Sequence, residues 1–149
     1  MTAPQPFDPG SAGVPPAEPE RAGGPRSQGL MLCDDLIFFS RVAATAKAAG
    51  LAVKQVRSVP ALLDAVKQSP PGGVILDLHL DGLDVPALLA GLRSACPAMP
   101  RTVAFGSHVE AETLRAARHA GVDLVLPRSQ FVAELEGSLS EWLRADVEQ

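Results

Sequence analysis

The sequence predicts an α/β domain with one doubly wound, five-stranded parallel sheet and helices on both faces, of the flavodoxin type. Two observations lead to this prediction. Short apolar runs alternate five times with helical stretches between residues 30 and 145, which is the pattern of repeated βα units. The apolar runs are continuous rather than alternating, as expected of strands that are covered on both faces. Right-handed crossovers then leave few topologies, and the doubly wound one is the simplest.

Each half of a βα unit can be placed from its residue pattern. The five predicted strands are residues 30–33, 52–56, 74–78, 102–105 and 124–126. The five predicted helices are residues 36–49, the stretch from Ser58 to the PPGG at 70–73, the stretch that begins at Asp84, residues 109–120 and residues 131–143. Ser58 and Asp84 are typical N-caps, and Gly50 and Gly121 are typical of a helix end.

Composition excludes several classes of function. The chain has 149 residues, a net charge of −4 and a pI near 5.3, whereas a nucleic-acid surface needs clustered positive charge. No apolar run approaches the roughly 18 residues needed to span a membrane, and the N-terminus has no apolar core of a signal peptide. We therefore expect a cytoplasmic protein with neither nucleic acid nor membrane as a partner.

The ends of the chain differ from its middle. Residues 1–28 contain seven of the fourteen prolines and almost no aliphatic side chains, so they are predicted to form a disordered tail. Met31 leaves open that the working protein starts there. Residues 29–145 are predicted to be the folded domain, followed by a short tail at 146–149.

Carboxylates follow the first and the third predicted strands. Asp34 and Asp35 come after the first strand, and Asp77 lies near the end of the third, in VILDLHLDGLD. In doubly wound folds ligands bind at the carboxyl ends of the strands, at the switch point. Converging carboxylates repel one another, and a hard cation such as Mg²⁺, which takes oxygen ligands, would relieve that repulsion.

Four stretches of the sequence resemble the receiver domain of bacterial two-component response regulators, and the resemblance covers residues 30–145. The stretches are LMLCDD, VILDLHLDGLD, AFGSH and AGVDLVLPRSQF. The resemblance implies phosphoryl transfer from a sensor histidine kinase to Asp77. It also implies Mg²⁺ held by Asp34, Asp35, Asp77 and the backbone carbonyl of His79. Receivers signal through the surface of their fourth helix, fifth strand and fifth helix, so contact with a kinase or other signalling protein, or a homodimer, is expected there.

The chain departs from the family at the residues that sense the phosphoryl group. Gly106 stands where the family has Thr or Ser, with Ser107 one residue later, and Arg128 stands in place of a Lys. Val125 replaces the usual aromatic of the fifth strand. An ungapped match would pair Cys33 and Asp34, rather than Asp34 and Asp35, with the acidic pair of the family. The resemblance is thus to a degenerate receiver.

Two functions follow from this interpretation. The chain is a stand-alone receiver module in a phosphorelay that accepts phosphate on Asp77, or a phosphorylation-independent pseudo-receiver that acts through protein contacts. An enzyme or nucleotide binder would want a Gly-rich phosphate loop after the first strand, where this chain has CDDLIFF. We expect no enzyme activity. Cys33 is interpreted as a small core residue, and Cys96 as a residue of a connecting loop.

Overall fold

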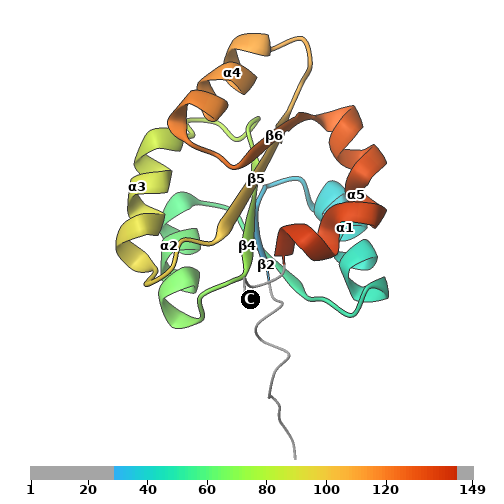
Figure 1. Cartoon of the computed structure of the whole chain (residues 1–149), viewed down its shortest axis with the longest axis horizontal. Coiled ribbons are helices and arrows are strands. Elements are labelled where there is room, and N and C mark those ends of the chain that lie inside the picture. Colours follow the sequence, from blue (N-terminus) through green and yellow to red (C-terminus); the bar gives the residue numbers. More distant parts are fainter. Residues whose placement is uncertain (1–28, 144–149) are drawn as a thin grey trace, which may run out of the picture.

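Five parallel strands form one sheet in the computed structural model of the chain, which describes residues 29–143 (Figure 1). The strands are β2 (Gly29–Leu32), β3 (Val53–Val56), β4 (Gly73–Asp77), β5 (Arg101–Gly106) and β6 (Leu124–Pro127). Their order is β3-β2-β4-β5-β6, and every neighbouring pair is parallel. The predicted doubly wound sheet is therefore confirmed. The predicted tails, residues 1–28 and 146–149, lie outside the described residues, as do 144 and 145.

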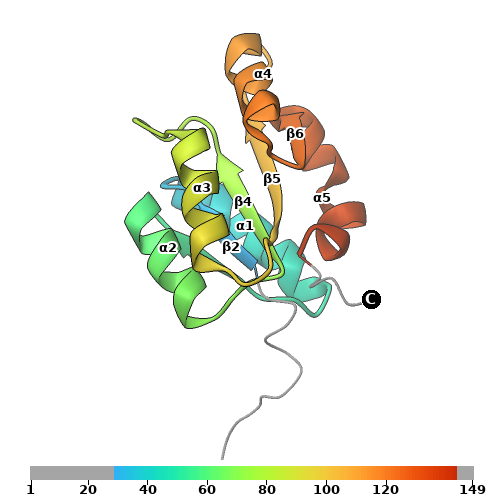
Figure 2. The same cartoon turned by 60° about the vertical axis from the view of Figure 1, so that its left-hand side comes forward.

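Five helices cover the two faces of the sheet, two on one side and three on the other (Figures 1 and 2). They are α1 (Leu36–Ala48), α2 (Val59–Gln68), α3 (Val85–Ala95), α4 (Ala111–Ala120) and α5 (Arg128–Leu143). Helices α1 and α5 pack on one face, and α2, α3 and α4 pack on the other. No helix among residues 29–143 is long and apolar enough to cross a membrane.

Both core layers draw on the same strands, because successive strand residues point to opposite faces. On β4, Val74 and Leu76 belong to the layer under α2, α3 and α4, while Ile75 belongs to the layer under α1 and α5. A strand with cores on both sides needs an apolar residue at every position. This is the physical reason for the continuous apolar runs of the sequence.

The predicted helix caps are confirmed. The side chains of Ser58 and Asp84 accept hydrogen bonds from the N–H groups of Ala61 and Ala87, at 3.2 and 3.1 Å. Gly121 ends α4 in the left-handed region, with φ at 111°, which suits glycine. The element bounds differ from prediction by at most three residues. The largest difference is α5, which begins at Arg128, directly after β6, and not at residue 131.

The end of α5 packs tightly against the amino ends of β2 and β4. A Cβ atom built on Gly73 would collide with the backbone carbonyl oxygen of Trp142, and one built on Gly29 would collide with Leu143. Both strands must therefore begin with glycine for α5 to lie this close to the sheet.

We expect Gly73→Ala to lower the free energy of unfolding by about 1–3 kcal/mol or more, as overpacking against a rigid backbone does. Gly137→Ala is the matched control, because Gly137 lies on α5 and a Cβ at that position meets nothing within 4 Å. It should be neutral or stabilising by about 0.5–1 kcal/mol, since alanine is the better helix former. Urea unfolding measures both. Equal stability of the two variants would contradict the close approach.

Candidate functional site at the carboxyl edge of the sheet

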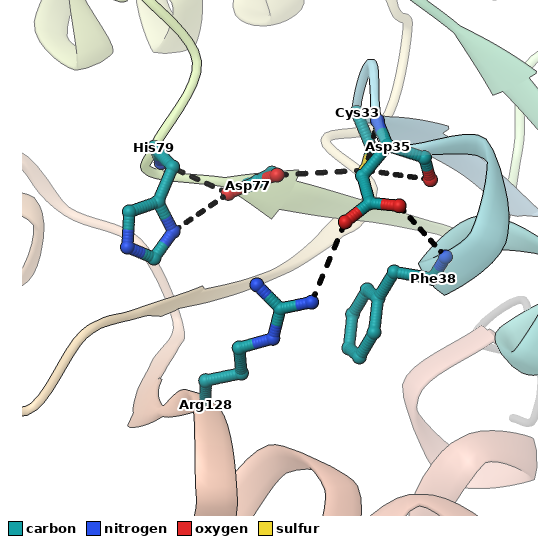
Figure 3. A network of polar contacts seen from close by, with 6 residues as sticks. All are labelled: Cys33, Asp35, Phe38, Asp77, His79 and Arg128. Carbon is teal, nitrogen blue, oxygen red and sulfur yellow. Dashed lines mark hydrogen bonds and ion pairs between the residues drawn. The ribbon is translucent and has the colours of Figure 1, made fainter.

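Asp77 ends the central strand β4, beside Phe105 of β5, and is only 5% exposed. A carboxylate this deeply buried is costly unless its oxygens are hydrogen-bonded or paired with charge. The surroundings of Asp77 therefore decide what the residue can do. Figure 3 shows its side chain between His79 on one side and Cys33 on the other.

His79 satisfies one carboxylate oxygen. Its backbone N–H donates to Oδ1 of Asp77 at 2.9 Å, and its Nδ1 lies 3.3 Å from the same oxygen. Leu80 donates its N–H to the backbone carbonyl of Asp77, at 3.2 Å. The chain thus turns back on itself directly after β4, which places His79 over the carboxylate.

Cys33 satisfies the other oxygen. Its Sγ lies 3.5 Å from Oδ2 of Asp77 and accepts the backbone N–H of Asp35 at 3.3 Å. The side chain is fully buried, and burial, with a smaller contribution from the charge of Asp77, raises the pKa of the thiol to about 11. Cys33 therefore stays protonated near neutral pH, and its one S–H hydrogen has two acceptors in range, Oδ2 of Asp77 and the backbone carbonyl of Asp35, 3.6 Å from Sγ.

Asp35 begins helix α1. Its Oδ1 accepts the N–H of Phe38 at 3.0 Å, and its Oδ2 lies 3.6 Å from Nη2 of Arg128. The Phe38 N–H first, and the Arg128 charge after it, lower the pKa of this carboxyl. Asp35 is thus the N-cap of α1. Asp34, by contrast, is exposed.

Arg128 is held by α1. Its guanidinium carbon lies 4.1 Å from the centroid of the Phe38 ring, a cation–π distance, while its Nη2 meets Asp35. Figure 3 shows the guanidinium directed towards Asp35. Within residues 29–143 no ion pair joins Arg128 to Asp77. The cation that replaces the family's Lys is thus engaged elsewhere.

Gly106 and Ser107 lie at the end of β5. A Cβ on Gly106 would lie 3.2 Å from Cδ2 of Leu114 and 3.4 Å from Cβ of Leu78, so a hydroxyl-bearing residue there would crowd two leucines. The Oγ of Ser107 accepts the N–H of Val109 at 3.3 Å and shapes the turn into α4. Val125 packs in the core layer under α2, α3 and α4.

The donor set fits Mg²⁺ poorly. Hard cations take several oxygen ligands, but a protonated thiol occupies one side of Asp77, and Asp35 is paired with Arg128. Within the described part of the chain, no three His, Cys, Asp or Glu side chains are grouped so that they could hold a metal ion. Magnesium binding by Asp34, Asp35, Asp77 and His79 stays a prediction.

The structure joins the predicted residues into two linked groups. Asp77 contacts His79, and Asp35 contacts Arg128. Cys33, which sequence reasoning treated only as a core residue, bridges the two groups. An ungapped match to the receiver family places Cys33 in the first acidic position of that family. That match is the sequence signal that could have identified Cys33 as a residue of the site.

Comparisons with solved structures find receiver domains. The chain is 25% identical to the receiver domain of NtrX from Brucella abortus, with a TM-score of 0.59 over 74% of this chain and 98% of that one. It is 19% identical to the receiver domain of a response regulator from Bermanella marisrubri, with a TM-score of 0.67 over 78% and 97%. For the beryllofluoride-activated NtrC4 receiver dimer, the values are 14% and 0.63 over 78% and 98%. No protein-family model and no curated protein matches the chain.

We expect the folded state to lose stability as the pH rises from about 9 towards 11, because it holds Cys33 protonated while the unfolded chain ionises near the usual pKa of 9.0. Cys33→Ser keeps a donor to Asp77 but removes this ionisation, so its stability should fall less over that range. Urea midpoints of both proteins at pH 8 and pH 10 measure the difference. Parallel pH profiles would contradict the assigned role of the thiol.

Proposed function

Starting from its receiver-domain fold, we propose that this chain is a phosphorylation-independent receiver-like module that works in signalling through protein contacts. One observation carries the proposal: Asp77 is buried, and both of its carboxylate oxygens already have partners, His79 and Cys33. Asp77, the residue that would accept phosphate, thus makes internal contacts that connect the ends of β2 and β4.

The chemistry of phosphoryl transfer supports this role. Transfer requires in-line access to the attacking oxygen and cations that neutralise the charge of the phosphoryl group. Asp77 offers little access, and Arg128 is paired with Asp35 and stacked on Phe38. Cys33 supplies no negative charge to attract a divalent cation, because its thiol is protonated.

The response to phosphate would also be weak. A ligand shifts a conformational equilibrium only through a difference in its affinity for the two states. Gly106 offers no hydroxyl, and Leu78 and Leu114 crowd the space that a larger residue would need. Val125 is an aliphatic core residue on β6. A phosphoryl group would therefore find few contacts that distinguish one state from another.

The second candidate is a working phosphoacceptor in a phosphorelay with a sensor histidine kinase. The position of Asp77 at the end of the central strand favours it, and the similar NtrC4 receiver was solved as a beryllofluoride-activated dimer. A homodimer of this chain remains a prediction.

We expect no gain in intact mass when the protein is incubated with acetyl phosphate and Mg²⁺, and amide NMR shifts near α4 that are unchanged by beryllofluoride. An active receiver domain treated in parallel is the positive control. A mass gain of one phosphoryl group in this protein, absent from Asp77→Asn, would support the second candidate instead.

Magnesium should distinguish the native site from a restored one. Cys33→Asp places a second carboxylate beside Asp77, so its Tm should fall in EDTA and recover by several degrees with excess Mg²⁺, because binding to the folded state alone stabilises it. Cys33→Ser and the unaltered protein should respond little. An equal Mg²⁺ response of the unaltered protein would show that its own residues form a complete site.

A further inference from the structure

An open pocket of about 410 Å³ lies beside the carboxylate site, between the segment that follows β4 and helix α4. Its lining is mostly apolar: Leu78, Leu83, Val85, Pro86, Ala116 and Ala117. Asp84 and Thr113 supply the polar part. The volume lies within the range of roughly 300–1,000 Å³ that is typical of ligand pockets, so one large apolar side chain and its neighbours would fit.

The pocket is fixed by the fold. The N–H of Leu78 donates to the carbonyl of Phe105 at 3.0 Å, and that of Leu83 donates to the carbonyl of Leu80 at 3.3 Å. Asp84 caps α3. On α4, small side chains at positions 113, 116 and 117 face the pocket, while Leu114 is buried in the core. Figure 1 shows α3 and α4 on the same side of the sheet. A partner would not have to order this surface, which reduces the entropic cost of binding.

The surroundings of the pocket are acidic. Four carboxylates lie on the two segments that form it, those of Asp81, Asp84, Glu110 and Glu112. The sequence has no Lys or Arg between Lys67 and Arg93. Helix α4 carries two arginines, and both are engaged: Arg115 lies 3.0 Å from Glu112, and Nη2 of Arg118 donates to the backbone carbonyl of Val125 at 3.2 Å. Asp81 and Glu110 are exposed, and the Glu110 side chain makes no capping hydrogen bond. Apolar lining and acidic surroundings together define the chemistry of the pocket.

We propose that the pocket binds a basic amphipathic segment of a partner protein, with an apolar anchor inside it and Lys or Arg side chains against these carboxylates. Other occupants suit the charge less well. A second copy of the chain is itself acidic, and its exposed Leu36 and Ile37 follow the exposed Asp34. The phosphates of nucleic acids and the headgroups of anionic lipids would be repelled.

This inference rests on the proposed role as an interaction module, but it does not involve Asp77 chemistry. The pocket also lies between α3 and α4, whereas the expected signalling surface of receivers is formed by α4, β6 and α5. A partner could therefore bind the pocket without contacting β6, the edge strand of the sheet.

The probe is a short, fluorescently labelled helical peptide with leucines along one face and lysines elsewhere. Fluorescence anisotropy with the unphosphorylated protein should show binding that weakens as salt is added, because exposed charge pairs are screened. A peptide of the same composition with its leucines scattered, and one with Glu in place of Lys, should each bind at least about tenfold more weakly.

Two matched pairs of variants locate the contact. Ala116→Phe fills the pocket and should weaken binding about tenfold, or ~1.4 kcal/mol, whereas Ala44→Phe, at an exposed alanine of α1 on the opposite face, should not. Glu110→Lys should weaken binding, and Glu136→Lys, which makes the same charge change on α5, should have a smaller effect. Circular dichroism and Tm check that each variant is folded.

Three results would overturn the inference: equal binding of the scattered peptide, indifference to Ala116→Phe, or self-association of the protein that Ala116→Phe abolishes. The last result would assign the pocket to a second copy. Because the experiment uses no phosphate, its failure is distinct from a mass gain with acetyl phosphate, which would overturn only the proposed function.

Discussion

The burial of one carboxylate at the end of the central strand is the constraint on which this site depends. Asp77 lies at the meeting point of β2, β4 and β5, so its charge must be satisfied by groups that the neighbouring strands and turns bring to it. His79 supplies a backbone N–H and a ring nitrogen, and Cys33 supplies a thiol. None of these is a permanent full charge, so the site is held by hydrogen bonds rather than by ion pairs.

The permanently charged side chains at this edge form a separate group of contacts. Asp35 and Arg128 pair with each other, and Phe38 lies against the guanidinium. Phe38 in turn packs against Phe105 and Phe131, with ring centroids 5.0 and 5.9 Å away. The beginnings of α1 and α5 are thereby joined to the core. Releasing Arg128 towards Asp77 would break a cation–π contact and an ion pair and would leave the Asp35 carboxylate without its cation.

Much of the fold could be predicted because its signals are local. Ser58 and Asp84 are followed by helical patterns, and the VIL run before Asp77 has an apolar residue at every position. The site was only partly predictable, because its contacts join residues far apart in the chain. Cys33 and Asp77 are separated by 44 positions, and a thiol within an apolar run looks like a core residue whether or not it meets a carboxylate. The pocket depends on how α3 and α4 are spaced, which small residues at 113, 116 and 117 do not reveal by themselves.

The tight packing of α5 against the two strand-initial glycines has a topological consequence. Leu143, the last described residue of α5, lies against Gly29, the first residue of β2. The first and the last described residues of the domain therefore lie next to each other, at the edge of the sheet opposite Asp77. A short linker between these two positions would be enough for a circular permutant, with new termini in the exposed connection at residues 97–99. Such a rearrangement would leave the strand order, both core layers and the carboxyl edge intact.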